Sequence, residues 1–503
     1  MKVARWVISG FIVVSLLFMV AQLYLLNNKI LEQSKILQQP QLEQRSGSFI
    51  PILDLGINVG TFPHTNHRGT TAISAMPISS PSSLKGPVIY LLRNGTYPEL
   101  LFDIYAYNNN YLSVDPVFVT ANDSILAFTG DYSDKKHILA KILRITFSGQ
   151  VTEVYSYDCG AQDPGGYFWG EDAVTGAIWK GHRAEGGIRI IKSIDDGQTW
   201  TTKYITRYET PPHVYEVAAS DDKVFAALSF PVHTVLYSGD GGDTWDAVLS
   251  AGYSIEGISL FGEMMYALTA GEEIWTCSYM QPNRWQQIYL PRGISLMNTT
   301  IFRQAKMLGR YIVTCGIAGT DTTTYWATAD NFYTISPLFR FGPTNKGANE
   351  RYSGFGSTIY IGGSRYGDGM VWKGEIPESL TTRIPCLRTI LNLDSLAEGK
   401  LSSLEECWVF DSRLSPTFTL NVTCKYHASA TQGVKIHVIS SADGRNFDSV
   451  DTYTEIHPFS AGQTIQKTYT FNGAGVIKVQ IENLDDLQAL TDIRVIGTLG
   501  ALN

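Results

Sequence analysis

Residues 193–200, Ser-Ile-Asp-Asp-Gly-Gln-Thr-Trp, are repeated with few changes at residues 238–245, Ser-Gly-Asp-Gly-Gly-Asp-Thr-Trp. Both segments fit Ser-x-Asp-x-Gly-x-Thr-Trp, and they begin 45 residues apart (238 minus 193). In such a pattern the Asp side chain can bond turn amides, Gly permits unusual backbone angles, and Trp packs beneath a hairpin. An interval of roughly 40–50 residues is typical of a repeated four-stranded unit. The two segments therefore predict recurring hairpin turns in a repeat protein.

This pattern resembles the Asp-box, or BNR repeat, of sialidases, some xyloglucan-cleaving glycosidases, sortilin-type receptors and a photosystem assembly factor. The resemblance implies a β-propeller in which the box lies at an outer hairpin, remote from the funnel. It also implies a structural role for the matching residues, which are Ser193, Asp195, Gly197, Thr199, Trp200, Ser238, Asp240, Gly242, Thr244 and Trp245. Weaker copies lie at residues 278–285, which lack the Asp and Gly, and at residues 328–335, which keep Thr, Asp and Thr.

Short apolar segments separated by turn residues extend on both sides of the boxes. Three longer units end in a complete or weak box, at residues 168–200, 213–245 and 254–285. Box-less units of similar texture lie at residues 88–100, 138–154 and 352–373. Short strands with frequent turn signals predict an all-β fold. We expect a β-propeller of about seven four-stranded blades over residues 60–376.

The pattern of short apolar segments and turn residues changes after the last expected blade. Residues 377–401 contain two prolines and lack blade signals, so we expect a linker there. Residues 402–503 contain alternating strands, which predict an antiparallel β-sandwich. Within them, residues 440–447 resemble a hairpin common in accessory sandwiches of secreted glycan-active proteins.

The N-terminus carries a long apolar run. Residues 7–26 are twenty consecutive residues without a charge, which is long enough for a transmembrane helix. We expect residues 1–6 to be a cytoplasmic stub and residues 27–59 to be a stalk or linker. The alternative is a cleaved signal peptide, which would make the protein secreted. The run is longer than a usual signal core, so the prediction is a single-pass protein of the cell membrane with most of the chain extracytoplasmic.

Sequons and cysteines bear on the compartment. Four sequons lie beyond the apolar run and are glycosylation candidates if that side is outside, at Asn94, Asn122, Asn298 and Asn421. All six cysteines also lie there, an even number compatible with an oxidising compartment or with buried free thiols. No Cys or His cluster with ligand spacing occurs, so we expect no metal and no cofactor. The formal charge of −8, without a long basic run, argues against nucleic acid as a partner.

Two classes of chemistry are compatible with the propeller. The resemblance suggests a sialidase-like or other exo-acting glycoside hydrolase, whose acids would come from Glu171, Asp172 and Glu216. However, sialidases carry Arg-Ile-Pro before the first blade, and the copy here, at residues 383–385, follows the last one. A binding funnel would instead use side chains from Trp169, Tyr215, Glu256, Arg303, Arg351 and Arg365.

We therefore expect a membrane-anchored binding, adhesion or scaffolding protein without a catalytic residue, recognising a glycan or another surface protein. The hydrolase is the first alternative, and a purely structural envelope component is the second. This expectation rests on the fold, which is a weak guide to function. The sequence indicates no oligomeric state.

Overall fold

The computed structural model describes residues 49–78, 82–93, 97–172, 174–208, 210–229, 231–271, 273–290, 300–318, 322–341, 351–363, 369–380, 383–473 and 475–500. The chain from residue 49 onward clusters into one compact unit. Within the described residues, no helix is both long and apolar enough to cross a membrane. The predicted stub and membrane helix, and the stalk up to residue 48, lie outside these residues.

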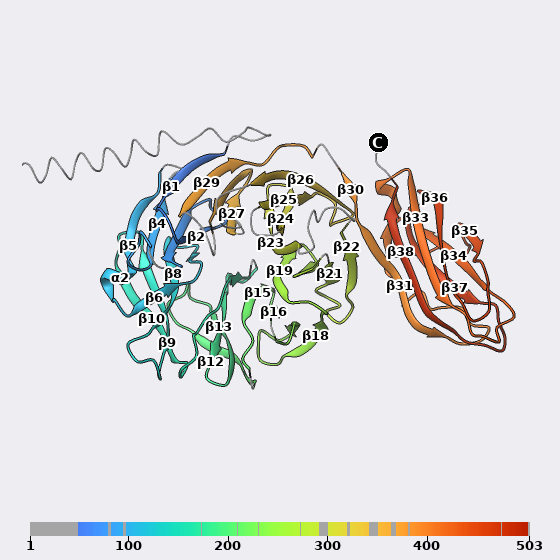
Figure 1. Ribbon diagram of the computed structural model, residues 1–503, viewed down its shortest axis with the longest axis horizontal. Coiled ribbons are helices and arrows are strands. Elements are labelled where there is room, and N and C mark those ends of the chain that lie inside the picture. Colours follow the sequence, from blue (N-terminus) through green and yellow to red (C-terminus); the bar gives the residue numbers. More distant parts are fainter. Residues whose placement is uncertain are drawn as a thin grey trace, which may run out of the picture. The chain divides into compact units, whose positions relative to one another are not determined.

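Antiparallel four-stranded sheets follow one another along the chain and surround a common centre, forming a β-propeller (Figure 1). The first three blades contain β2 (Val59–Thr65), β3 (Thr71–Pro77), β4 (Val88–Leu92) and β5 (Glu99–Asp103); β6 (Tyr111–Val114), β7 (Phe118–Val119), β8 (Ser124–Asp131), β9 (Leu139–Thr146) and β10 (Val151–Asp158); and β11 (Trp169–Glu171), β12 (Ile178–Ala184), β13 (Gly187–Ser193) and β14 (Thr201–Arg207). A short helix, α2 (Ile104–Tyr107), connects the first two blades.

The remaining blades repeat the same order of strands. They contain β15 (Val214–Ser220), β16 (Lys223–Leu228), β17 (Thr234–Ser238) and β18 (Asp246–Ser250); β19 (Ile255–Phe261), β20 (Met264–Thr269), β21 (Glu273–Ser278) and β22 (Gln286–Tyr289); β23 (Thr300–Leu308), β24 (Tyr311–Ala318), β25 (Thr322–Thr328) and β26 (Thr334–Phe341); and β27 (Arg351–Phe355), β28 (Thr358–Gly362) and β29 (Met370–Glu375). The all-β class and the β-propeller architecture predicted from the sequence are thus confirmed.

The ring closes through its N-terminal strand. β1 (Ile50–Asp54) pairs with β29 and becomes the fourth strand of the last blade. The propeller therefore begins about ten residues before the expected boundary at residue 60, inside the segment predicted as stalk. A strand of five residues that contains a proline lacks the alternation that would reveal it in the sequence.

First strands of neighbouring blades lie side by side around the centre, so their side chains decide what the centre contains. β2 contacts β27, β15 contacts β19, and β19 contacts β23. Isolated parallel bridges from Gly166 to Val214 and from Asp172 to Ala219 join the β11–β14 blade to the β15–β18 blade. The core between blades is apolar, as where the buried Trp179 packs against Val217 and Val224 of the following blade.

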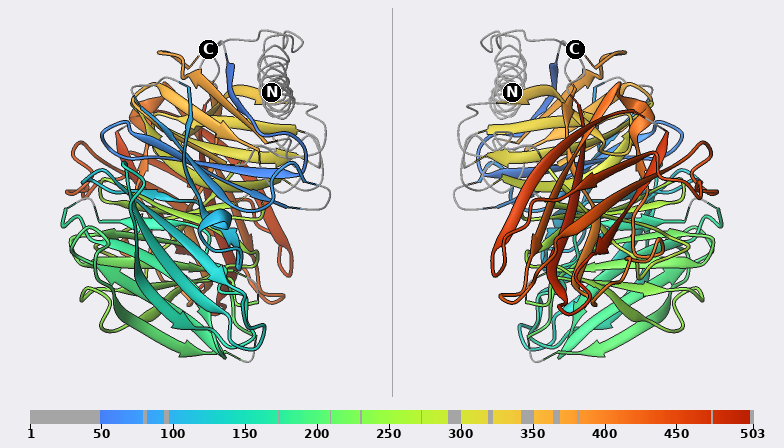
Figure 2. Two further views of the ribbon diagram at one scale, coloured as in Figure 1. Left: turned by 90° about the vertical axis from the view of Figure 1, so that its left-hand side faces the viewer. Right: turned by 90° about the vertical axis from the view of Figure 1, so that its right-hand side faces the viewer.

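The C-terminal domain, residues 387–500, has two four-stranded sheets that share one apolar core. One sheet contains β31 (Leu387–Leu396), β38 (Leu490–Leu499), β33 (Thr417–Lys425) and β36 (Thr464–Asn472), and the other contains β32 (Phe410–Asp411), β37 (Val476–Asn483), β34 (Val434–Ser441) and β35 (Tyr453–Ile456). A 3-10 turn, η1 (Ser412–Leu414), follows β32. Figure 2 shows these strands, coloured orange to red, broadside in its right-hand view.

The predicted linker contains strands. β30 (Ile384–Pro385) pairs with β26, and β31 pairs with both β38 and β22. At the β22 junction, Ile288 lies opposite Arg388 and Tyr289 lies opposite Leu387. The sheet of the β19–β22 blade thus continues into the C-terminal domain, where the sequence suggested a break. The pairing joins residues about 100 positions apart, which no local pattern reveals.

Candidate functional site

A small cavity lies at the centre of the propeller, lined by first strands of several blades. Its volume is about 40 Å³, which is room for roughly three water molecules. The polar and aromatic side chains that face it include His64, Trp169, Glu216, Lys306, Arg351 and Tyr352. The cavity therefore gathers charged groups from β2, β15, β23 and β27 in one place.

Glu216 is the acid of this cavity. The register of β15 shifts beside it, between Val214 and Glu216. Its Oε2 accepts a hydrogen bond from the backbone N–H of Ile258, on the neighbouring first strand, at 3.1 Å. Burial raises the pKa of Glu216 to about 8, although Lys306 and Arg351 act in the opposite direction. The carboxyl is therefore largely protonated at neutral pH.

The basic groups of the cavity are held in different ways. Burial lowers the pKa of Lys306, and the charge of Glu216 opposes that change. Burial, with a contribution from Lys306, lowers the pKa of His64 to about 3. The Nδ1 atom of His64 accepts from the backbone N–H of Val119 at 3.1 Å, which fits a neutral imidazole.

Arg351 is enclosed by aromatic rings. Its guanidinium carbon lies 4.7 Å from the ring centre of Phe168, 5.7 Å from that of Phe62 and 5.8 Å from that of Tyr167. Trp169 is fixed because its indole N–H donates to the carbonyl of Pro116 at 2.6 Å. These contacts make the cavity wall rigid, with the charge of Arg351 spread over apolar surface.

A buried ion pair lies behind this wall. The Nζ of Lys180, which is completely buried, is 3.1 Å from Oδ2 of Asp115 and 3.0 Å from the carbonyl of Gly166. It also lies 4.9 Å from the ring centres of Phe128 and Trp169. Burial raises the pKa of Asp115 to about 6, with Lys180 opposing it. The pair joins the β6–β10 blade to the β11–β14 blade.

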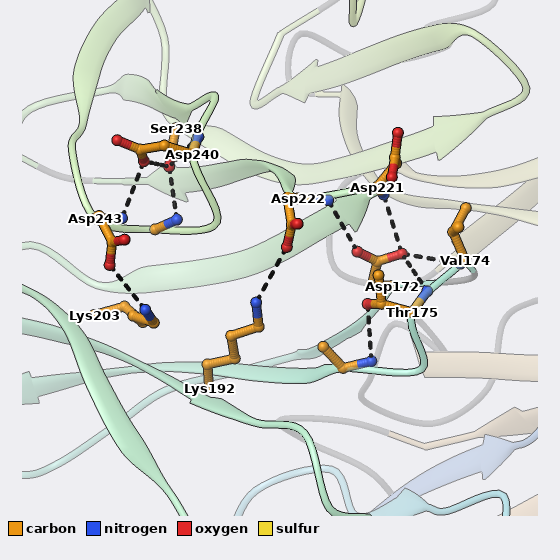
Figure 3. Close-up of polar contacts among 12 residues, drawn as sticks. Asp172, Val174, Thr175, Lys192, Lys203, Asp221, Asp222, Ser238, Asp240 and Asp243 are labelled. Carbon is orange, nitrogen blue, oxygen red and sulfur yellow. Dashed lines mark hydrogen bonds and ion pairs between the residues drawn. The ribbon is translucent and has the colours of Figure 1, made fainter.

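The structure corrects the interpretation of Asp172 as a catalytic acid. Its carboxylate accepts from the backbone N–H groups of Val174 and Thr175 in its own turn, and from those of Asp221 and Asp222 in the next blade (Figure 3). Burial would raise the pKa of Asp172, but these donors lower it overall. Asp172 therefore stabilises two turns, and its position after a first strand did not reveal this role.

The other predicted site residues are dispersed. Glu171 lies 3.8 Å from the imidazole of His67, and burial raises its pKa. Tyr215 is buried and stacks on Tyr167, with ring centres 4.5 Å apart. Glu256 is buried on β19.

The two remaining arginine candidates are less informative. Arg303 lies in β23 with its backbone opposite Cys315, and its side chain is outside the description. Arg365 is outside the described residues altogether. Of the predicted residues, Trp169, Glu216 and Arg351 thus meet at the cavity.

Two of the cavity residues that the sequence reasoning missed are His64 and Lys306. Both lie in first strands of blades without a complete box, β2 and β23. A charged residue in a first strand is the signal that could have identified Lys306, although Arg303 and Gln304 in the same strand make that signal weak. For His64 no comparable signal exists, because an imidazole is often satisfied within a core.

The first box is a closed hydrogen-bonded turn between β13 and β14. Ser193 Oγ donates to Asp195 Oδ1 at 2.8 Å and accepts from the Gly197 N–H at 2.9 Å. Asp195 also accepts from the N–H of Thr199 at 2.9 Å and from its hydroxyl at 2.6 Å. The indole N–H of Trp200 donates to the Gly197 carbonyl at 3.2 Å. The Ser, Asp, Thr and Trp side chains of the pattern are thus all bonded within the turn.

The same turn recurs at two more hairpins. Between β17 and β18, Asp240 accepts from the N–H and hydroxyl of Thr244 at 2.9 and 2.6 Å (Figure 3 shows this turn). Between β25 and β26, Asp330 accepts from both groups of Thr334 at the same distances. The third turn replaces Gly by Phe332 at φ 61°, which is fully buried. The weak copy at residues 328–335 therefore keeps the geometry of the complete boxes.

The structure describes two of the four sequons and all six cysteines. Asn122 is exposed, but the amide of Asn421 is bonded to Thr468 and Gln466 within a sheet. Asn94 and Asn298 lie outside the described residues. All six cysteines are buried, and the structure shows no disulfide among them. In the part of the chain that the structure describes, no group of three His, Cys, Asp or Glu side chains could hold a metal ion.

Comparisons with known proteins add the following. No protein-family model matches the chain, and no curated protein matches it. Solved structures that resemble it include a YCF48 protein bound to D1 peptide, with 12% identity, a TM-score of 0.45, and coverage of 68% of this chain and 99% of that one. The periplasmic gluconolactonase PpgL of Pseudomonas aeruginosa has 10% identity, a TM-score of 0.42, and coverage of 65% and 98%.

A third similar structure comes from a study of two prolyl endopeptidases. It has 10% identity and a TM-score of 0.44, and the match covers 67% of this chain. The chain spans only 55% of the length of that structure.

Proposed function

We propose that this protein is a membrane-anchored, extracytoplasmic binding or scaffolding protein, with a seven-bladed propeller and a C-terminal β-sandwich, that recognises a glycan or another surface protein. The observation that carries the proposal is the composition of the central cavity. Among the described residues that line it, Glu216 is the one carboxyl group. Glycoside hydrolysis generally uses two carboxyl groups roughly 5–9.5 Å apart.

The size of the cavity supports the same conclusion. A volume of about 40 Å³ holds a few water molecules but not a sugar ring. The other acids predicted for hydrolysis are engaged elsewhere, Asp172 with four backbone N–H groups and Glu171 beside His67. A folded propeller with a filled centre is suited to present its outer surfaces to a partner.

The membrane part of the proposal rests on the uncharged run of residues 7–26. Protease treatment of intact cells that express the full chain tests it. We expect degradation of the propeller while the protein is cell-bound. A soluble product in the medium that lacks residues 7–26 would establish signal cleavage and overturn the anchor. Resistance to protease on intact cells would overturn the outward orientation.

Assays of the full chain in detergent micelles distinguish the binding function from hydrolysis. We expect binding to immobilised glycans or to extracted surface proteins, without release of the aglycone from a panel of aryl glycosides. A turnover that disappears in Glu216→Gln would overturn the binding proposal. Absence of every bound partner would favour a purely structural role in the envelope.

One observation favours the hydrolase as a second candidate. Glu216 has a pKa raised to about 8, and a carboxyl group that stays protonated at neutral pH can act as a general acid. In that case the rate of aryl glycoside cleavage would fall as the pH rises through about 8. A rate that is independent of pH between 6 and 9 would exclude Glu216 as the acid.

A further inference from the structure

A larger pocket lies where the propeller meets the C-terminal domain. Its volume is about 280 Å³, and four aromatic side chains line it: Trp275, Trp285, Tyr289 and Trp408. The first three come from β21, β22 and the turn between them, and Trp408 precedes β32. This pocket, called the junction pocket below, is distant in sequence from every residue of the central cavity.

The walls of the junction pocket are held by the pairing of β22 with β31. Gln286 donates through Nε2 to the carbonyl of Thr389 at 2.8 Å, and Arg388 donates through a guanidinium N–H to Oε1 of Gln286 at 2.8 Å. A second N–H of Arg388 donates to the carbonyl of Asn331 at 2.9 Å. Both sides of the pocket are therefore fixed by buried hydrogen bonds, and the pocket is formed before any ligand arrives.

Polar side chains stand among the aromatic ones. Gln287 lies opposite Trp275 on the paired strands, and Asn392 lies opposite Arg494. The guanidinium carbon of Arg494 is 5.0 Å from the ring centre of Tyr289. No carboxylate lines the pocket within the described part of the chain. The pocket thus offers flat apolar surfaces, two amides and one positive charge.

Unused hydrogen-bonding groups lie in the same walls. The indole N–H groups of Trp275, Trp285 and Trp408 and the hydroxyl of Thr389 are buried and have no partner among the described residues. A buried polar group without a partner costs about 1–3 kcal/mol, so native proteins contain few of them. Because these atoms are buried within the wall, a ligand in the pocket meets the indole rings and not their N–H groups.

We propose that the junction pocket binds the terminal pyranose ring of an acidic saccharide. The C–H face of the ring packs against the indoles, the hydroxyls meet Gln287 and Asn392, and the carboxylate pairs with Arg494. A volume of about 280 Å³ is at the small end for ligand pockets and suits a compact ring better than an extended peptide. The inference rests on the proposed binding function and assigns a ligand class and a place to it.

The test uses the full chain in detergent micelles with two probes, oligosaccharides that end in glucuronic acid or in glucose. Tryptophan fluorescence and calorimetric titration report binding. We expect the glucuronic acid probe to bind more tightly, and Arg494→Gln to weaken it about tenfold while changing the affinity for glucose by about twofold or less.

Three variants complete the design. Trp275→Ala should lower the affinity for both probes about tenfold. Asn392→Ala, at an exposed position where folding is not at risk, should weaken both by a smaller factor. Arg310→Gln removes an exposed arginine on the β23–β24 turn and should bind both probes like the wild type.

The failures are distinguishable. If both probes bind and the Arg494 and Asn392 variants behave like the wild type, the pocket assignment is overturned while the binding function stands. If neither saccharide binds but a surface protein is captured, the saccharide is overturned and the broader function stands. A proline-rich peptide that binds in a Trp275-dependent way would also overturn the saccharide.

Discussion

The centre of the propeller and the junction pocket are both hollow, but their walls differ in chemistry. At the centre, Glu216, Lys306 and Arg351 meet around about 40 Å³. At the junction, tryptophans surround about 280 Å³ together with a single arginine. The polar groups of the centre face one another and connect neighbouring blades, as where Glu216 accepts from the N–H of Ile258. The aromatic rings at the junction present apolar faces, beside Arg494, to the space that they enclose, so we expect structural effects from the centre and binding effects from the junction.

The largest expected effect comes from the ion pair behind the cavity. Replacing Lys180 by Met leaves Asp115 buried without its partner, and breaking a buried pair in this way costs about 3–5 kcal/mol. Denaturant unfolding of the full chain in detergent measures the free energy. The double variant with Asp115→Asn should recover part of the loss, because the unpaired carboxylate is then removed.

Lys203→Met is the matched control. Its Nζ lies 2.8 Å from Asp243, whose side chain is 68% exposed, so the pair is worth about 1 kcal/mol or less. Equal losses for the Lys180 and Lys203 variants would contradict the structural role that we give to the buried charges near the centre.

A smaller effect is expected at the junction itself. Arg388→Met removes the bonds to Gln286 and Asn331 and should cost about 2–3 kcal/mol, a typical range for hydrogen bonds to a buried charged group. Because these bonds connect the blade to the C-terminal domain, calorimetry should show two separated unfolding transitions in place of one. The exposed Arg310→Met should leave the profile unchanged. One transition with an unchanged midpoint would mean that the β22–β31 pairing does not couple the two parts.

Sequence reasoning reached the propeller because its signals are local. The Asp of a box bonds the Thr four residues later, so the spacing alone reveals the turn. Candidate acids were harder, because Asp172 is used by a turn of the next blade, more than 45 residues away. The junction pocket could not be predicted, since Trp275 and Arg494 meet only through the pairing of β22 with β31 and of β31 with β38. Turns formed by residues close in sequence could therefore be predicted, whereas a pocket assembled from strands of different sheets could not.

The protonation of the centre gives a pH-dependent prediction. The folded protein keeps a proton on Glu216 up to a pKa of about 8, whereas the unfolded chain loses it near the ordinary glutamate pKa of 4.5. Folding therefore takes up a proton in this window, and this contribution to stability is complete below about pH 4.5 and lost as the pH rises to 8.

We expect the free energy of unfolding of the wild type to fall relative to that of Glu216→Gln. The fall should be up to about 1.4 kcal/mol when the pH rises from 6 to 7. Burial also raises the pKa of Asp115 to about 6, but Asp115 is present in both proteins, so its contribution cancels in the difference. Chemical denaturation of both proteins at pH 6, 7 and 8 provides the data. If the free energies of unfolding of the two proteins changed with pH in parallel, Glu216 would not hold a proton in the folded protein. Its carboxyl group would then titrate like that of an exposed glutamate.

The smallest effect is expected at the two complete boxes, whose bonds lie within single hairpin turns. Ser193→Ala leaves the buried N–H of Gly197 without its acceptor and should cost about 1 kcal/mol. Ser238→Ala is the matched variant, because the corresponding bond to Gly242 is 2.8 Å long and equally buried. Similar losses in denaturant unfolding, with unchanged binding of the glucuronic acid probe, would assign the boxes to the scaffold alone. A loss of binding in either variant would show that the outer hairpins communicate with the junction pocket, and the separation between a structural centre and a binding junction would no longer hold.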